Sequence, residues 1–238
     1  MADEQRSEAG PDGRAVRWAG QRDRRRTEIV DAALAAIALH GPRVSTGQIA
    51  AQARIARPQL YRHFSDADEL YRAIGDRVAE HVVAELAPVV RRPGRTPRDI
   101  IDGAVHGFVE WLARNSQLYR FVTLQENVAS AGRINVVGDI KATLTAQIGD
   151  LLRGYMAALG VTPTTLAEPL AAGIVGLAES ATGQWLANPA GITRDKFANS
   201  LAGWIWGILH NALQLHGVHL AADDELPQLQ PDQPGPMV

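Results

Sequence analysis

The chain has 238 residues, of which 46% are hydrophobic and 21% charged, a composition typical of a globular protein with a sizeable core. It contains no cysteine, which excludes disulfide scaffolds, cysteine-ligated zinc, iron–sulfur clusters and thiol nucleophiles. The formal net charge is −2, but residues 14–64 hold ten arginines against three acidic residues, so this stretch carries +7 and the remainder −9. A basic segment on an acidic body is typical of a module that binds a polyanion. The alternative is that the arginine excess reflects genome base composition, because Lys141 and Lys196 are the only lysines.

The two chain ends are predicted to lie outside the folded part. Residues 1–23 combine glycines, Pro11 and charges without an apolar period, which predicts a disordered basic extension, and the proline-rich segment 226–238 predicts a disordered tail. Residues 1–20 lack the apolar stretch of a signal peptide, and the most hydrophobic later segment, 197–215, is too polar for a membrane span. We therefore expect a cytoplasmic protein with no membrane contact.

The rest of the chain has the apolar spacing of helices. Apolar residues recur at intervals of three and four, and no turn-bounded segment alternates as a strand does, so the predicted fold is all-α with about nine helices. We expect an N-terminal three-helix domain over 24–75 and a C-terminal helical domain over 76–225. The expected helices span 27–40, 46–53, 57–64, 66–88, 98–114, 117–128, 133–159, 165–187 and 194–216.

Residues 45–64 carry the most informative pattern in the chain. Ile49 and Ala53 face inward from a first short helix, and Ile55 closes the turn that follows. Leu60 and Phe64 then bury the inner face of a second helix that begins near Arg57. Two short helices with this spacing of apolar residues predict a helix-turn-helix, although a helical hairpin with a solvated polar face is the alternative.

The outward residues of this motif are suited to DNA. Arg57, Gln59, Arg62 and His63 carry groups that bind base edges or phosphates, and Tyr61 donates to a phosphate. Arginines before the motif offer further contacts, either along the backbone or in a minor groove, with a solvated helix start as the alternative. The candidate DNA-binding residues are Thr46, Arg57, Gln59, Tyr61, Arg62, His63, Arg24, Arg25 and Arg26.

At this point the sequence resembles a known family. The string Leu60-Tyr-Arg-His-Phe-Ser-Asp-Ala-Asp-Glu-Leu70, with Ile49-Ala-Ala-Gln-Ala before it, resembles the DNA-binding domain of the tetracycline-repressor (TetR) family over about residues 24–75. The resemblance implies that residues 24–75 form a helix-turn-helix DNA-binding domain and residues 76–225 a helical ligand-binding and dimerisation domain. It further implies a homodimer, a double-stranded operator with two half-sites and a ligand pocket in the C-terminal helices. Two residues depart from the family pattern. Arg54 stands at the usual turn glycine, which predicts a left-handed or near-bridge backbone with some strain, and Ala67 stands where the family often has a phosphate-contacting lysine.

The C-terminal helices supply candidate ligand and dimer residues. A helical bundle holds a small organic ligand in a mostly apolar cavity with a few polar groups, although aromatic residues at helical spacing also form plain core. The candidate ligand-binding residues are His106, Trp111, Tyr119, Phe121, Gln125 and Met156. The resemblance implies that the last two helices pair across a two-fold axis, which makes Leu177, Trp185, Trp204 and Ile208 the candidate dimer residues.

Enzymatic and metal-dependent functions have little support. His210, His216 and His219 lie near Asp223 and Asp224, but Gly217 interrupts any helix that would align them on a metal. No phosphate loop or nucleophile motif is present, and no cofactor is expected. We therefore expect a homodimeric regulator, a repressor released from a palindromic operator by a small apolar ligand. The alternatives are a regulator without an effector, whose C-terminal helices dimerise or recruit a partner, and an all-α enzyme with a basic extension.

Overall fold

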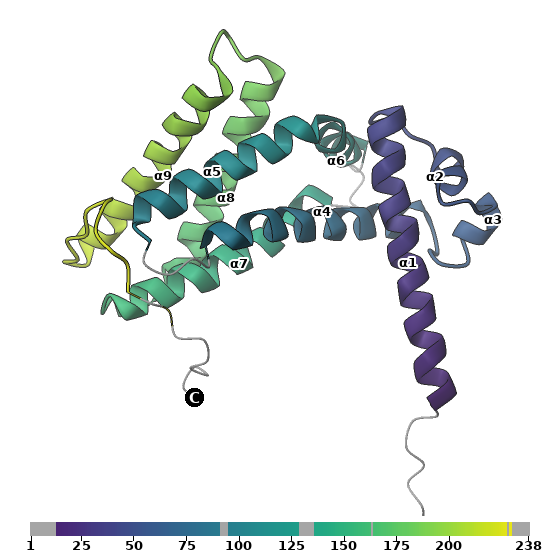
Figure 1. Ribbon diagram of the computed structural model, residues 1–238, viewed down its shortest axis with the longest axis horizontal. Coiled ribbons are helices and arrows are strands. Elements are labelled where there is room, and N and C mark those ends of the chain that lie inside the picture. Colours follow the sequence, from purple (N-terminus) through teal and green to yellow (C-terminus); the bar gives the residue numbers. More distant parts are fainter. Residues whose placement is uncertain (1–12, 91–94, 129–135, 163, 228, 230–238) are drawn as a thin grey trace, which may run out of the picture.

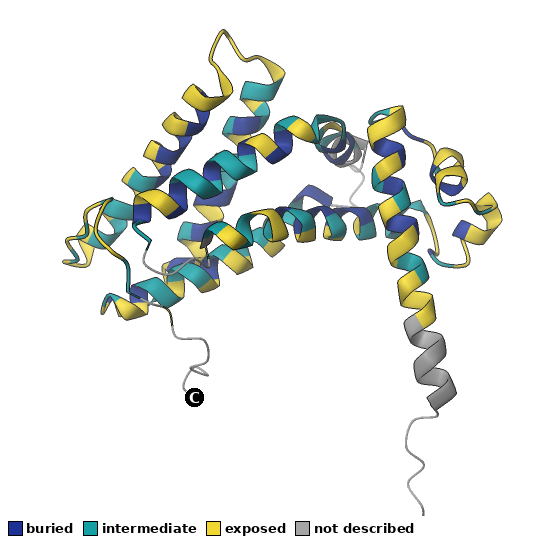
Figure 2. Cartoon of the chain, in the orientation of Figure 1, coloured by how far each residue is buried: buried dark blue, intermediate teal, exposed yellow. Residues whose placement is uncertain are grey.

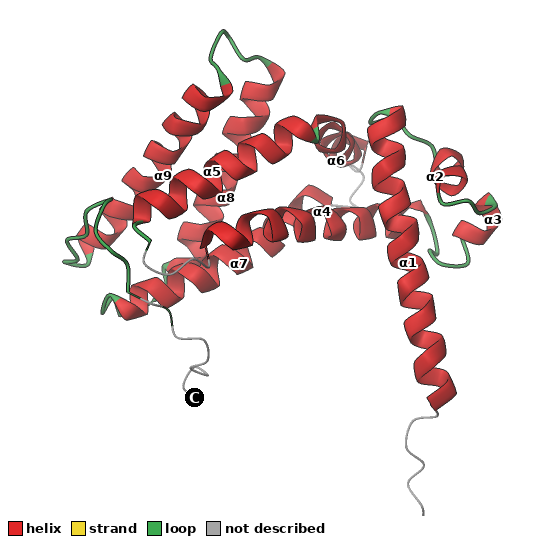
Figure 3. Ribbon diagram, in the orientation of Figure 1, coloured by secondary structure: helices red, strands yellow, loops and turns green. Residues whose placement is uncertain are grey.

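The computed structural model describes residues 13–90, 95–128, 136–162, 164–227 and 229. Over these residues the structure is helical and contains no strand, which confirms the predicted all-α fold (Figure 3). The described helices are α1 (Gly13–His40), α2 (Thr46–Gln52), α3 (Arg57–Leu60), α4 (Ala67–Val90), α5 (Pro97–Arg114), α6 (Ser116–Val128), α7 (Val136–Ala158), α8 (Ala167–Ala187) and α9 (Arg194–Leu215).

The molecule is elongated, with a small module at one end. Helices α1, α2 and α3 form this module, and α8 and α9 form a hairpin at the opposite end (Figure 1). Helix α4 runs from the module into the body and packs against α1, α5 and α7. The body is completed by α7 packed on α8 and by α5 packed on α9. One helix therefore belongs to both parts of the molecule.

The core is continuous across the boundary predicted at residues 75 and 76. One cluster joins the module residues Ile29 and Phe64 to Phe121 and Val136 of the body, and the buried faces of these helices point toward one another (Figure 2). Gly75 permits the close approach of α4 to α7, because a Cβ there would lie 2.5 Å from Val136 Cγ1. The module and the body thus share one packed core.

The structure corrects three boundaries. Helix α1 begins at Gly13, so residues 13–23 are helical where a disordered extension was predicted. Regular helix in α3 ends at Leu60, and a tight turn follows in which the His63 amide donates to Leu60 O at 3.0 Å, where a helix to Phe64 was expected. The predicted disordered tail begins packed, since the Leu226 amide donates to Arg95 O at 3.1 Å.

A junction centred on Arg26 fixes the module. The guanidinium of Arg26 donates to Glu69 Oε1 at 2.7 Å and to the carbonyl of His63, and it lies 4.4 Å from the ring centroid of Phe64. Glu69 also accepts from the Ser65 amide at 2.6 Å, so it caps the start of α4. Because one side chain of α1 binds both the turn after α3, at His63, and the cap of α4, it fixes their relative positions.

Replacement of Glu69 by glutamine tests this junction. The hydrogen bond from the Ser65 backbone and the one from Arg26 lower the pKa of Glu69 from 4.5 to about 2. The stabilisation by the carboxylate is therefore complete above pH 4.5 and is lost as the pH falls toward 2. We expect Glu69→Gln to lower the free energy of unfolding at neutral pH by about 1–2 kcal/mol, measured by thermal or urea denaturation.

Glu80→Gln on the same helix is the matched control, because Glu80 pairs with Arg77 at the surface, where its side chain is 63% exposed. That change is expected to cost less than about 0.5 kcal/mol. Equal losses in the two variants, or a loss in Glu69→Gln that does not diminish between pH 4.5 and 2, would contradict the role of the junction.

Candidate nucleic-acid interface and ligand cavity

Local signals in residues 45–56 build the helix-turn-helix. Ser45 caps α2 through a capping box, in which its Oγ accepts from the Gln48 amide at 3.2 Å and its own amide donates to Gln48 Oε1 at 2.8 Å. After α2 the chain turns through Arg54, whose φ of 55° confirms the predicted left-handed backbone. The Ile55 amide then donates to Ala50 O at 3.0 Å, which closes the turn. The two helices are therefore held at a fixed angle.

The second helix presents its polar residues to solvent. Leu60 is fully buried, while Arg57 and Arg62 are exposed. Gln59 is exposed as well, but its Oε1 accepts from the Ala56 amide at 3.0 Å and caps the helix start. Gln59 therefore uses one lone pair of its amide oxygen within the motif and keeps its amide nitrogen as a donor for other partners.

Thr46, Arg57 and Tyr61 form one cluster on the outer surface. Hydrogen bonds with Thr46 and then with Arg57 lower the pKa of Tyr61, and the Arg57 guanidinium carbon lies 5.8 Å from the Tyr61 ring centroid. The structure therefore brings together three predicted DNA-binding residues from α2, α3 and the turn after α3. An arginine and a phenol held side by side in this way suit a phosphate or a base edge.

His63 is held in a different environment from its neighbours. It is only partly exposed, its Nδ1 is buried, and within the described part of the chain this atom has no hydrogen-bond partner. Burial lowers the pKa of His63, and the positive charges of Arg25, Arg26 and Arg22 lower it further. The imidazole is therefore neutral at physiological pH and has one nitrogen without a partner.

The arginines before the motif do not behave alike. Arg24 is exposed, and Arg25 pairs with Glu28 at 2.6 Å. Arg26 is committed to its internal junction, so its assignment as a DNA contact is corrected to that of a structural residue. Among the residues that the structure describes, the module arginines that make no ion pair are Arg22, Arg24, Arg43, Arg54, Arg57 and Arg62.

The body encloses a cavity of about 540 Å³ lined by residues of α4 to α9, a size typical of a site for one small organic molecule. Of the predicted ligand residues, Trp111, Tyr119 and Met156 line it. Phe121 and His106 do not, which corrects their assignment. The ring of Phe121 meets Tyr71 edge-on at 5.4 Å in the shared core, and His106 Nδ1 lies 2.8 Å from Asp102 O within α5. The side chain of Gln125 lies outside the described part.

Sequence analysis named Tyr119 as a ligand residue but not the two charged residues beside it in the cavity. Lys141 of α7 and Glu179 of α8 both line it and pair at 3.0 Å, and the Tyr119 hydroxyl donates to Glu179 at 3.2 Å. These residues come from three helices and share no local spacing. Only the packing of α6, α7 and α8 brings them together.

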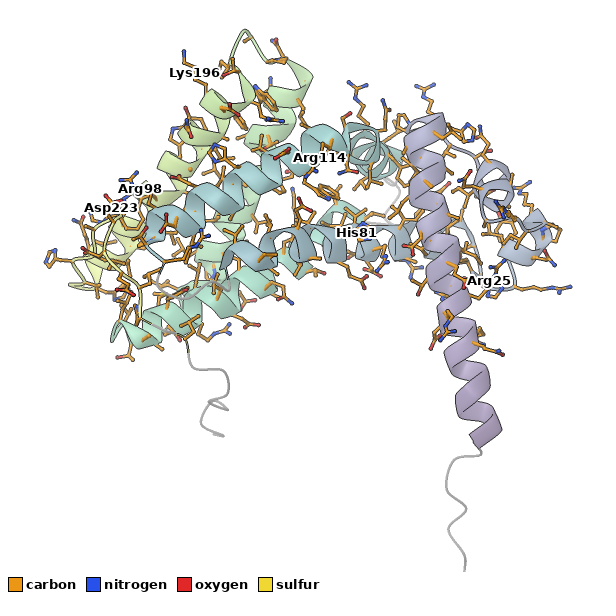
Figure 4. All side chains as sticks on the ribbon, in the orientation of Figure 1. Arg25, His81, Arg98, Arg114, Lys196 and Asp223 are labelled. Carbon is orange, nitrogen blue, oxygen red and sulfur yellow. The ribbon has the colours of Figure 1, made fainter. Side chains whose placement is uncertain are left out.

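The C-terminal segment closes the far end of the body. Leu220 and Leu226 line the cavity, and the Arg98 amide donates to Ala222 O at 2.9 Å. Arg98 and Asp223 form an exposed ion pair at 2.6 Å, at the end of the body opposite the module (Figure 4). The residues after α9 therefore form part of the cavity wall.

The outer face of α9 carries exposed apolar residues. Trp204 is 52% exposed and Ile208 is 39% exposed, and Leu215 lies on the same face. Gly173 and Gly176 of α8 have open space where a side chain would be. The other two predicted dimer residues, Leu177 and Trp185, are half-buried and pack against the core of α5, α8 and α9, and Trp185 stacks on Phe197 at 5.1 Å.

The described residues contain no group of three or more side chains that could hold a metal ion. No helix among them is both long and apolar enough to cross a membrane.

Comparisons with known proteins match both parts of the chain. The family model described as bacterial regulatory proteins, tetR family, matches residues 29–74, and the model described as tetracyclin repressor-like, C-terminal domain, matches residues 92–220. An uncharacterised HTH-type transcriptional regulator of Mycobacterium tuberculosis is 28% identical over 206 residues, covering 87% of this chain and 86% of that protein.

Two further proteins support the match. The HTH-type transcriptional activator FasR of Mycolicibacterium smegmatis is 26% identical over 187 residues, covering 78% of this chain and 83% of that protein. The crystal structure of the TetR family repressor AlkX of Dietzia, implicated in biodegradation of n-alkanes, has a TM-score of 0.56 at 18% identity and covers 78% of this chain and 95% of its own. The chain belongs to the tetR family of bacterial regulatory proteins, and it is a DNA-binding transcriptional regulator and not an enzyme.

Proposed function

We propose that this protein is a homodimeric repressor that a small apolar ligand releases from a palindromic operator. The observation that carries the proposal is the sharing of α4: its first half packs in the core of the DNA-binding module, and its second half, including Val82 and Leu86, lines the cavity. A ligand that displaces the second half of α4 therefore displaces the module.

The outward face of α3 and the following turn supports the DNA-binding part of the proposal. Arg57, Tyr61 and Arg62 are exposed, and the positive charges of Arg22 and Arg25 act on the neighbouring His63. Arg57 has the fork of donors that binds guanine bidentately, and Tyr61 offers a hydroxyl to a phosphate. We assign base contacts to Arg57, Gln59 and His63, and backbone contacts to Thr46, Tyr61 and Arg62, with Arg24 and Arg25 as further phosphate contacts.

The α8–α9 hairpin supports dimerisation. Trp204, Ile208 and Leu215 lie on one face of α9, exposed in the single chain. Open glycines on the neighbouring α8 allow a second copy to approach closely. Burial of such a face against itself produces a two-fold dimer, which places two modules on two operator half-sites about 34–36 Å apart or a multiple of one helical turn.

The coupling between ligand and operator follows from differential affinity. The ligand weakens operator binding only if it binds the conformation with misplaced modules more tightly. The alternative, a regulator without an effector, predicts a cavity that ligands fill without effect on DNA. FasR is an activator and AlkX a repressor, so reporter expression in a deletion strain decides the direction of regulation.

Substitutions on the recognition face, the outward side of α3 and of the turn after it, test which residues contact DNA. We expect Arg57→Ala to weaken binding to an operator selected from a random duplex pool by about 1–3 kcal/mol, and binding to random duplex by much less. Tyr61→Phe is expected to weaken both, because a phosphate contact carries no sequence information. Arg153→Ala, at an exposed position of α7, is the control. Mobility-shift assays measure the DNA affinity of the wild-type protein and the three variants. If Arg57→Ala lowers affinity equally for operator and random duplex, Arg57 does not read a base.

A charge on α9 tests the dimer. Trp204 is 52% exposed in the single chain. Trp204→Glu places a charge in the proposed interface, so we expect sedimentation velocity to show monomers in place of dimers. Leu39→Glu is the matched control, since Leu39 is 69% exposed on α1, and it is expected to leave the dimer intact. If the Trp204→Glu protein stays dimeric, the dimer interface does not lie on this face of α9.

Operator affinity measured with and without ligand tests the release mechanism. The ligand is taken from a panel of apolar compounds ranked by thermal shift. A coupling in the usual allosteric range makes saturating ligand weaken operator affinity roughly 5–150-fold. Trp111→Ala is expected to reduce ligand affinity, because Trp111 lines the cavity. A compound that raises the melting temperature without changing operator affinity would favour the regulator without an effector.

A further inference from the structure

The cavity wall carries one ion pair and no net charge. Lys141 Nζ lies 3.0 Å from Glu179 Oε2, and the Tyr119 hydroxyl donates to Glu179 Oε1 at 3.2 Å. Among the described residues that line the cavity, no other side chain is charged. A ligand therefore meets a mostly apolar wall with one charged group, made of Lys141, Glu179 and the phenol of Tyr119. Among the described lining residues, Thr123, Gln147 and Tyr155 add uncharged polar side chains.

This polar group is held by close packing. Gly183 of α8 lies directly against the Tyr119 hydroxyl, so any side chain at position 183 would displace the phenol from Glu179. The side chain of Glu179 is 23% exposed and that of Lys141 is 38% exposed. The pair is thus partly shielded from water and positioned by three helices.

The hydrogen-bonding capacity of the pair selects the chemistry of a ligand. An ammonium has three N–H donors, and a carboxylate has lone pairs beyond the two that Lys141 and Tyr119 occupy. A ligand hydroxyl can accept from Lys141 and donate to Glu179, and a carbonyl can accept from Lys141. A ligand carboxylate would share Lys141 with Glu179, which leaves an excess negative charge against apolar walls, and that arrangement is costly.

The shape of the cavity selects the rest of the ligand. Lining residues recur along α7 from Val137 to Met156, a rise of about 30 Å along the helix. A cavity whose lining extends along most of α7 suits an extended chain better than a compact ring system.

We propose that the effector is an uncharged, chain-like apolar molecule that carries a hydroxyl or carbonyl group, which binds at Lys141 and Glu179. This inference rests on the proposed function of the cavity as the effector site. It excludes the corresponding carboxylate as the preferred ligand.

Calorimetric titration of the full-length protein with dodecanol, methyl dodecanoate and dodecanoate tests the inference, below their micelle concentrations and at a pH where dodecanoate is ionised. We expect dodecanol and methyl dodecanoate to bind wild-type protein about tenfold more tightly than dodecanoate. Equal or tighter binding of dodecanoate would overturn the inference, and so would the absence of binding by all three.

Two variants test the role of the charges. Glu179→Gln keeps an oxygen that accepts from Tyr119 but leaves Lys141 without its counter-charge. The affinity of this variant for dodecanoate is therefore expected to rise about tenfold relative to its affinity for dodecanol. Lys141→Met is expected to weaken the binding of dodecanoate below that of the wild-type protein. Asp150→Asn is the control, because Asp150 pairs with Arg153 on the exposed side of the same helix and does not line the cavity. A preference that is the same in all four proteins would show that the ion pair does not select the ligand.

These titrations contain no DNA, so their outcome is separate from that of the proposed function. If the uncharged ligands bind preferentially but leave operator affinity unchanged, release from DNA fails and the ligand assignment stands. If dodecanoate binds best and releases the operator, the regulatory function stands and the ligand assignment fails.

Discussion

The structure depends on the packing of one helix, α4, between two halves of a single core. Its first turns bury Leu70 and Ile74 against the module, and its later turns place Val82 and Leu86 at the cavity. Close-packed cores change between discrete arrangements and do not deform continuously, so the module and the cavity cannot reorganise independently. The contact of Tyr71 with Phe121, and that of Gly75 with Val136, extend the same constraint to α6 and α7.

This constraint explains why the Arg26 junction lies where it does. The segment that faces DNA, residues 57–64, has only one turn of regular helix, which is too short to hold its own orientation. Arg26 binds the carbonyl of His63 and the carboxylate of Glu69, so the end of that segment is attached to the start of α4. A tilt of α4 is thereby passed to the residues that face DNA, and the junction is as much a part of the interface as the residues that contact DNA.

Sequence predicts the parts of this molecule that local signals determine. The two short helices, the turn between them and the burial of Ile49, Leu60 and Phe64 follow from about twenty consecutive residues, and the structure bears them out. The left-handed backbone at Arg54 was expected from the family resemblance, and its φ of 55° agrees. The cavity follows from contacts between distant helices. Apolar spacing shows that Phe121 is buried but not what it packs against, and nothing near Lys141 indicates that Glu179 will lie beside it. The start of α1 was missed because Gly13 and Gly20 lower helix propensity in a segment without apolar periodicity.

Charge is distributed differently in the two parts of the protein, and this distribution limits how a ligand can act. In the body, Arg98, Arg114 and Arg153 each pair with a carboxylate. In the module, Arg25 and Arg26 are paired, but within the described residues Arg22, Arg24, Arg43, Arg54, Arg57 and Arg62 make no ion pair. Their uncancelled positive charge attracts the DNA backbone, and salt screens it within about 10 Å. An uncharged ligand in the cavity adds no charge to this attraction. In the proposed mechanism, a loss of DNA affinity would therefore come from the position of the module, which α4 sets, and not from a change in the electrostatic attraction.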